Sequence, residues 1–165
     1  MSNEPDKSIQ VLPHIYTLDD INEATSSSRF ANDLIESIRD GFVSYSKGDF
    51  NACPIQTMGA PPMSPFLANS GISSSTNDYS AQTCVKSGYL TGESHYVIKV
   101  ASGGYPFPSN SGLMQVFSQE TGRLDAILLD EGMLTELRTA AVGAVIANYL
   151  APKKVSSIGK FLFLP

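Results

Sequence analysis

Four short apolar segments follow one another closely, and their spacing constrains the fold more than any other feature of the sequence. They are residues 83–90 (TCVKSGYL), 95–101 (HYVIKVA), 112–118 (GLMQVFS) and 124–130 (LDAILLD). Parallel strands need a crossover of a dozen or more residues, so segments this close together are expected to pair mainly antiparallel. Thr121 and Gly122 supply the turn of a hairpin between the last two.

A helical segment precedes these strands. Its apolar residues follow the helical spacing and are Phe30, Leu34, Ile35, Ile38, Phe42 and Tyr45. The serines before Phe30 are expected to cap this helix, and Gly48 is expected to end it.

A second helical segment follows the strands, and the sequence predicts that Thr135 is its N-cap. Pro152 ends it. The many Ala and Gly residues between 140 and 147 suit a buried connector better than a surface helix.

Together these segments predict an α/β fold, in which a mainly antiparallel or mixed sheet packs with amphipathic helices. Residues 1–13 are expected to form a flexible leader, with a short extended piece starting at His14. Residues 14–152 form one domain, interrupted by a long loop at residues 60–80 that is rich in Pro, Ser, Asn and Gly. Residues 153–165 are a tail of unusual composition, whose apolar end could also pair as a terminal strand.

Composition excludes several classes of function. The net charge is −5 and no run of Lys or Arg occurs, so nucleic acid is not an expected partner. No apolar stretch approaches the roughly 20 residues of a membrane helix. The acidic, polar N-terminus is unlike a leader peptide, so the expected location is cytoplasmic. Cys53 and Cys84 are expected to be reduced, buried thiols.

No complete motif for phosphate, metal or nucleophile chemistry occurs in the sequence. The histidines, His14 and His95, lie far apart and are expected at the surface or at strand ends.

Two cations are better candidates for chemistry. Lys99 shares a strand face with Val97 and Ala101, so it either extends to an edge or meets an anion in a pocket. Arg138 is expected in the first turn of the second helix, where the helix dipole disfavours positive charge. It is either a solvated helix residue or a guanidinium held for a carboxylate or phosphate.

The run from Tyr96 to Gly159 closely resembles the ornithine cyclodeaminase/mu-crystallin family. The resemblance rests on the strand lysine, on ETG, on LLDEG-LT-LRTAA, and on YLAP followed by IG. It is specific over residues 80–159 and weaker from His14 to Met58.

The resemblance implies an enzyme that uses NAD or NADP on an amino or imino acid, by deaminating cyclisation or by ketimine reduction. It implies a substrate domain that dimerises through its sheet, followed by a Rossmann domain. By motif position, Lys99 and Arg138 would bind the substrate carboxylate, and Ser109 and Arg138 would lie at the nicotinamide.

The chain departs from the family pattern at two places. Many members carry an arginine where this chain has Ile55 or Gln56, and Gln56 offers a carboxylate hydrogen bonds without charge. After Gly159, where the family continues into its dinucleotide-binding turn and catalytic aspartate, this chain has KFLFLP. We therefore expect no catalytic residue and no stable cofactor binding in this chain alone. The alternatives are a non-enzymatic dimerisation module that modulates a full-length relative, and an anion site at Lys99 and Arg138 without chemistry.

Overall fold

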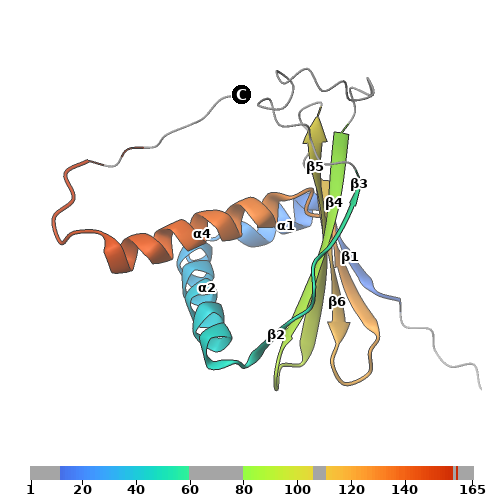
Figure 1. The fold of residues 1–165 in the computed structure, drawn as a ribbon. Helices are drawn as coiled ribbons and strands as arrows, with labels where there is room; N and C mark the ends of the chain where they lie inside the picture. The colour runs from blue at the N-terminus through green and yellow to red at the C-terminus, as the bar shows by residue number, and fades with distance from the viewer. Residues whose placement is uncertain (1–11, 60–79, 106–110, 158, 160–165) are drawn as a thin grey trace, which may run out of the picture.

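A computed structural model of the chain describes residues 12–59, 80–105, 111–157 and 159 (Figure 1). Most of the predicted leader, residues 60–79 of the predicted loop, Ser109 and the end of the predicted tail lie outside the described residues, and residue 80 begins a strand instead.

The centre of the fold is a seven-stranded mixed sheet. Its path is β1-β7-β6-β5-β4-β2, and β3 also pairs with β4. The strands are β1 (His14–Tyr16), β2 (Phe50–Ala52), β3 (Gln56–Gly59), β4 (Ser80–Leu90), β5 (His95–Tyr105), β6 (Ser111–Ser118) and β7 (Leu124–Leu128). Five of the pairings are antiparallel, and β1 with β7 is parallel. The predicted α/β fold with a mainly antiparallel or mixed sheet is confirmed.

Turns between the central strands form as the sequence indicates. Gly122 adopts a φ of 68°, and its N–H donates to the Ser118 carbonyl at 3.0 Å, which closes the β6–β7 hairpin. The strands β2 and β3 were not predicted, because each is only three or four residues long and is stabilised by its pairing with β4.

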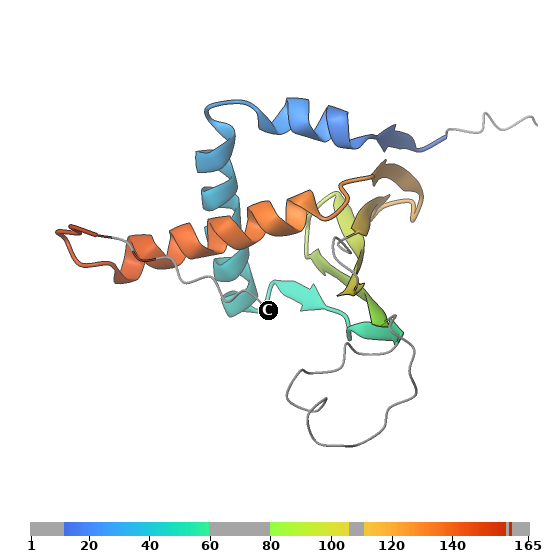
Figure 2. The same cartoon turned by 90° about the horizontal axis from the view of Figure 1, so that it is seen from above.

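Three helices lie on one side of the sheet: α1 (Leu18–Thr25), α2 (Phe30–Lys47) and α4 (Met133–Leu150) (Figures 1 and 2). The helix α1 was not predicted, although Thr17 and Asp20 form a capping box at its start. Gly48 ends α2 in the left-handed conformation, as expected. Arg29 is the N-cap of α2 and makes no side-chain capping bond, but one of the preceding serines acts at the helix start, because Ser27 Oγ accepts from the Arg29 N–H at 3.2 Å.

The helix α4 begins three residues earlier than the sequence indicated. Gly132 is its N-cap with a φ of 91°, so Thr135 is not the cap and Arg138 falls in the second turn. The capping acceptor is the Asp130 carboxylate, which accepts from the Leu134 N–H at 3.1 Å. A residue outside the helix thus satisfies one of the free amides at the start of α4.

Burial within the described residues is sparse. The buried hydrophobic side chains there are Ile21, Ala141 and Val145. The expectation that α4 is a buried connector is not met in its second half, where Ile146, Tyr149 and Leu150 are exposed. The expectation of two buried thiols is also wrong, since Cys53 is exposed and Cys84 is half-buried, although both are free.

The two faces of the sheet differ in their cover. The face that carries Lys99 is directed toward the helices, because Lys99 contacts Thr135 of α4. No described helix covers the opposite face (Figure 1). That open face carries a stacked pair, Tyr96 and Phe117, with ring centroids 5.2 Å apart.

Candidate functional site

Lys99 lies in the middle of the helix-side face of the sheet, at the point where α4 begins. Its Nζ donates a hydrogen bond to Oγ1 of Thr135. Of the two alternatives raised by the sequence, this contact shows that the side chain is held against α4 rather than extended to an edge. Thr135 was misassigned as a helix cap, and only the packing of α4 on β5 reveals that its hydroxyl faces the lysine.

Partial burial and neighbouring positive charges disfavour the charged form of Lys99. Partial burial lowers the pKa of Lys99 below its ordinary value of 10.5, and the positive charges of Arg138 and then Lys86 lower it further. The carboxylate of Asp130 acts in the opposite direction and favours the charged form. The positive charge of Arg138 therefore acts on Lys99, and so does that of Lys86, a third cation that the sequence pattern did not indicate.

Asp130 anchors the start of α4 beneath this cluster. Its side chain is only 1% exposed and accepts from the Leu134 N–H. The next two residues, Glu131 and Gly132, both have positive φ, 47° and 91°, which turns the chain sharply into the helix. The turn packs closely on β6, since a Cβ on Gly112 would lie 3.6 Å from Asp130 Oδ1. The LLDEG sequence thus forms a rigid base that fixes the first turns of α4.

A groove of about 640 Å³ opens beside Lys99 on the helix-side face. Its lining includes Lys86 and Lys99 together with apolar walls formed by Phe50, Ile55, Val97 and Met114. Lys86 is the register partner of Lys99, and Met114 is its partner on the other side, so these three side chains share one row across the sheet. A pocket with apolar walls and a few convergent polar groups is the usual form of a small-molecule site.

Gln56 lies elsewhere. It pairs with Val85, one residue before Lys86, and alternation along β4 therefore directs Gln56 to the face opposite Lys99. Ile55 lines the groove instead. Of the predicted carboxylate-binding residues, Lys99 lines the groove, whereas Arg138 acts on Lys99 through its charge without lining the groove. Gln56 is directed to the other face, and Ser109 lies outside the described residues.

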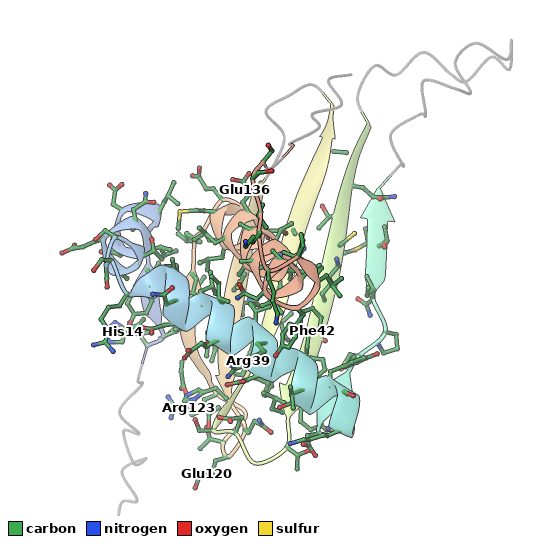
Figure 3. The ribbon with its side chains drawn as sticks, turned by 90° about the vertical axis from the view of Figure 1, so that its left-hand side faces the viewer. His14, Arg39, Phe42, Glu120, Arg123 and Glu136 are labelled. Atoms are coloured by element: carbon green, nitrogen blue, oxygen red, sulfur yellow. The ribbon has the colours of Figure 1, made fainter. Side chains whose placement is uncertain are left out.

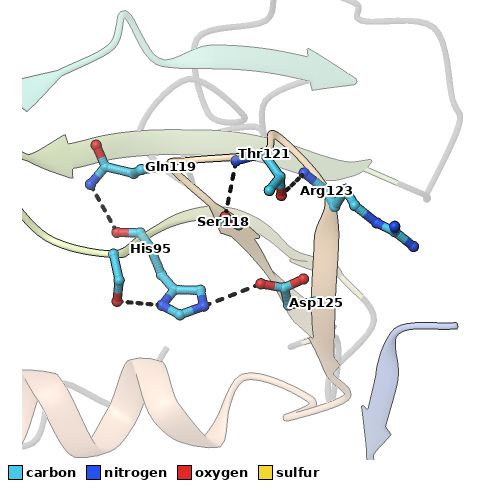
Figure 4. Close-up of polar contacts among 7 residues, drawn as sticks. His95, Ser118, Gln119, Thr121, Arg123 and Asp125 are labelled. Carbon is cyan, nitrogen blue, oxygen red and sulfur yellow. Dashed lines mark hydrogen bonds and ion pairs between the residues drawn. The ribbon is translucent and has the colours of Figure 1, made fainter. Parts of the chain in front are cut away.

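A second polar cluster lies at the far end of the same strands (Figure 4). His95 Nδ1 is 2.7 Å from Ser94 Oγ, and His95 Nε2 is 3.2 Å from Asp125 Oδ2. The order of groups is that of a nucleophile, a base and an acid, but the His95 and Asp125 side chains are 47% and 45% exposed. Because water solvates both partners, we interpret this cluster as a surface link from β5 to β7, in agreement with the expected strand-end position of His95.

Other kinds of site find no support in the part of the chain that the structure describes. It contains no group of three or more metal-ligating His, Cys, Asp or Glu side chains. Among the described helices, none is long and apolar enough to cross a membrane.

The fold is an α/β domain with two lysines in a groove on its helix-side face, and comparison with known proteins specifies its family. The model of the ornithine cyclodeaminase/mu-crystallin family matches residues 17–160. The chain therefore belongs to the ornithine cyclodeaminase/mu-crystallin family.

The chain is similar in sequence to individual proteins and similar in fold to solved structures. The chain is 38% identical over 84 residues to the uncharacterized cyclodeaminase y4tK of Sinorhizobium fredii, a match that spans 48% of this chain and 25% of the relative. The fold is similar to an archaeal alanine dehydrogenase dimer with bound NAD, with a TM-score of 0.63 and 20% identity over 86% of this chain and 38% of that one. It is equally similar to Thermococcus litoralis Δ1-pyrroline-2-carboxylate reductase in complex with NADH and L-proline, with a TM-score of 0.63 and 17% identity over 85% and 38%. The chain thus spans well under half the length of these relatives.

Proposed function

We propose that this chain is the substrate-carboxylate-binding part of an NAD(P)-dependent enzyme acting on an amino or imino acid. The observation that carries the proposal is Lys99, which lines a groove with apolar walls and lies where the positive charge of Arg138 acts on it. Arg138 lowers the pKa of Lys99, so the two positive charges are close, and a bound carboxylate would relieve their repulsion. The apolar walls suit the carbon skeleton of a small amino or imino acid.

In this proposal Lys99, Arg138 and Asp130 each help to bind or position the substrate carboxylate. Lys99 offers the carboxylate a charged donor, and its Nζ is positioned by the Thr135 hydroxyl. Arg138, from the second turn of α4, offers a planar pair of donors. The negative charge of Asp130 favours the charged form of Lys99, and its carboxylate accepts from the Leu134 N–H at the start of α4.

The described residues fit only part of a dinucleotide. The pyrophosphate of NAD binds at free amides of a helix N-terminus. Asp20 accepts from the Thr17 N–H at the start of α1, and Asp130 accepts at the start of α4. Carboxylates therefore occupy two of the described helix starts and would repel a pyrophosphate. We propose that only Arg138 of the described residues, together with Ser109, meets the nicotinamide, which would supply the hydride chemistry when bound.

The test is binding of L-proline to the purified chain, measured by calorimetry, with L-prolinamide as the matched ligand that lacks the carboxylate. We expect Lys99→Met and Arg138→Met each to weaken L-proline binding about tenfold or more, because each removes a charge-assisted hydrogen bond. Lys47→Met, at the end of α2, is the control and should leave binding unchanged. Equal affinity for the two ligands, or no effect of either site variant, would refute the proposal.

The open face of the sheet favours a second function, self-association. Val85, Ile98, Val100, Leu113 and Ile127 lie half-exposed on it, and Tyr89 is 42% exposed. A patch of this kind on the described surface is typical of an interface. We propose that it joins two copies of the chain, either in the enzyme or in a module that modulates a full-length relative.

Light scattering after size-exclusion chromatography tests this second proposal. Ile98→Lys, on the open face, should convert a dimer to a monomer. Phe42→Lys introduces the same charge at a residue of α2 that is 52% exposed on the helix side (Figure 3), and should leave the dimer intact. A monomeric wild-type chain would be contrary to the proposal.

A further inference from the structure

We infer that Lys86 is a substrate-binding residue, which supplies from β4 a second lysine beside Lys99 in the groove. The inference deepens the proposed function and rests on it. Nothing in the family motif pointed to Lys86, since the residues that carry the resemblance to a carboxylate site are Lys99 and Arg138.

The register of the sheet carries the first step. Lys86 in β4 is directly opposite Lys99 in β5, and directly opposite residues share a face with Cβ atoms about 4.5–5.5 Å apart. Two lysines in this arrangement repel one another unless an anion lies between them. The repulsion is expressed in the structure, because Lys86 lowers the pKa of Lys99.

The groove carries the second step. Lys86 and Lys99 both line it, together with Met114 from the next strand and Ile55 from the segment before β3. The β3–β4 pairing of Gln56 with Val85 and of Thr57 with Cys84, continued by one residue, brings Ile55 beside Lys86. The row across the sheet therefore runs Ile55, Lys86, Lys99, Met114. The apolar Ile55 occupies the outer position of this row, and the positive charge of Lys86 lies next to it in β4.

The charges around the groove carry the third step. Lys86 and Lys99 line the groove together, the positive charge of Arg138 also acts on Lys99, and the negative charge of Asp130 offsets these charges at Lys99. Asp130 is already used by the Leu134 N–H at the start of α4. The cluster therefore favours a ligand with a carboxylate over a neutral or cationic one. A substrate with a free ammonium at the end of its side chain is disfavoured next to Lys86.

The experiment compares wild type with Lys86→Met, Lys86→Arg, Lys99→Met and the control Lys47→Met. Each is titrated with L-proline and with L-prolinamide by calorimetry. Because Lys86 is exposed, we expect Lys86→Met to weaken L-proline binding roughly fivefold to tenfold, less than a fully buried partner would. Lys86→Arg should restore most of the loss, and L-prolinamide binding should be insensitive to all four variants. Circular dichroism of each variant establishes that the sheet is intact.

Three outcomes are distinguishable. Loss with Lys86→Met and rescue with Lys86→Arg support the inference. Loss with Lys99→Met while Lys86→Met stays within twofold of wild type overturns the inference and leaves the proposed function standing. If wild type binds L-proline no better than L-prolinamide, both fail.

Discussion

Asp130 gives the sharpest test of how this fold is held together. Its carboxylate is 1% exposed, accepts from the Leu134 N–H at 3.1 Å and supports the charge on Lys99. Replacing it with alanine removes a helix cap, which costs about 0.5–2 kcal/mol, and leaves a buried amide without its partner, which costs about 1–3 kcal/mol. The two costs overlap because they concern one hydrogen bond. We expect Asp130→Ala to lower the free energy of unfolding by about 2–3 kcal/mol.

The assay is urea unfolding followed by circular dichroism at 222 nm, which reports directly on the helices. For a chain of this length the expected loss corresponds to a fall in Tm of roughly 4–12 °C. Asp130→Asn keeps an acceptor of the same shape without the charge, and should fall between wild type and Asp130→Ala. Asp40→Ala is the matched control, since Asp40 is 66% exposed in an ion pair with Arg39. If Asp130→Ala unfolds within 0.5 kcal/mol of wild type, Asp130 is not what fixes the start of α4.

Three further predictions follow from named contacts. Gly59→Ala should lower the free energy of unfolding by more than about 2 kcal/mol, because φ is 93° and the new Cβ would lie 2.3 Å from the Ala81 carbonyl oxygen. Gly143→Ala, whose new Cβ has nothing within 4 Å, should raise the free energy of unfolding by roughly 1 kcal/mol. Chemical denaturation measures both values, and equal effects of the two variants would contradict the contact argument. Because the pKa of Lys99 is lowered in the folded chain, the unfolded chain binds more protons than the folded one between that pKa and 10.5. The free energy of unfolding of wild type should therefore rise relative to that of Lys99→Met as the pH rises through this window. A difference between the two proteins that does not change with pH would contradict the prediction. Asp125→Asn should change the free energy of unfolding by less than about 0.5 kcal/mol, because its contact with His95 is exposed; a larger thermal shift would show that this cluster is structural.

How much the sequence could predict differs between the fold and the site. The short spacing between the strands at residues 83–130 left antiparallel pairing as the main geometry, and Gly48 and Gly122 marked a helix end and a turn that the structure confirms. These two glycines could be predicted because a helix end and a turn depend on the conformation of a few neighbouring residues. The helix α1 was missed because it is only eight residues long, and β2 and β3 because their stability comes from β4 rather than from their own pattern.

The sequence by itself determined the α/β class and the antiparallel core of the sheet, and it indicated Lys99 and Arg138 as candidates for carboxylate binding. Periodicity and motif position are properties of the chain alone. Only the tertiary structure decided which cations meet. The strand register directs Gln56 to the far face and Lys86 to the near one, and the packing of α4 on β5 presents the Thr135 hydroxyl to Lys99. Register and packing depend on residues distant along the chain, so no local pattern encodes them.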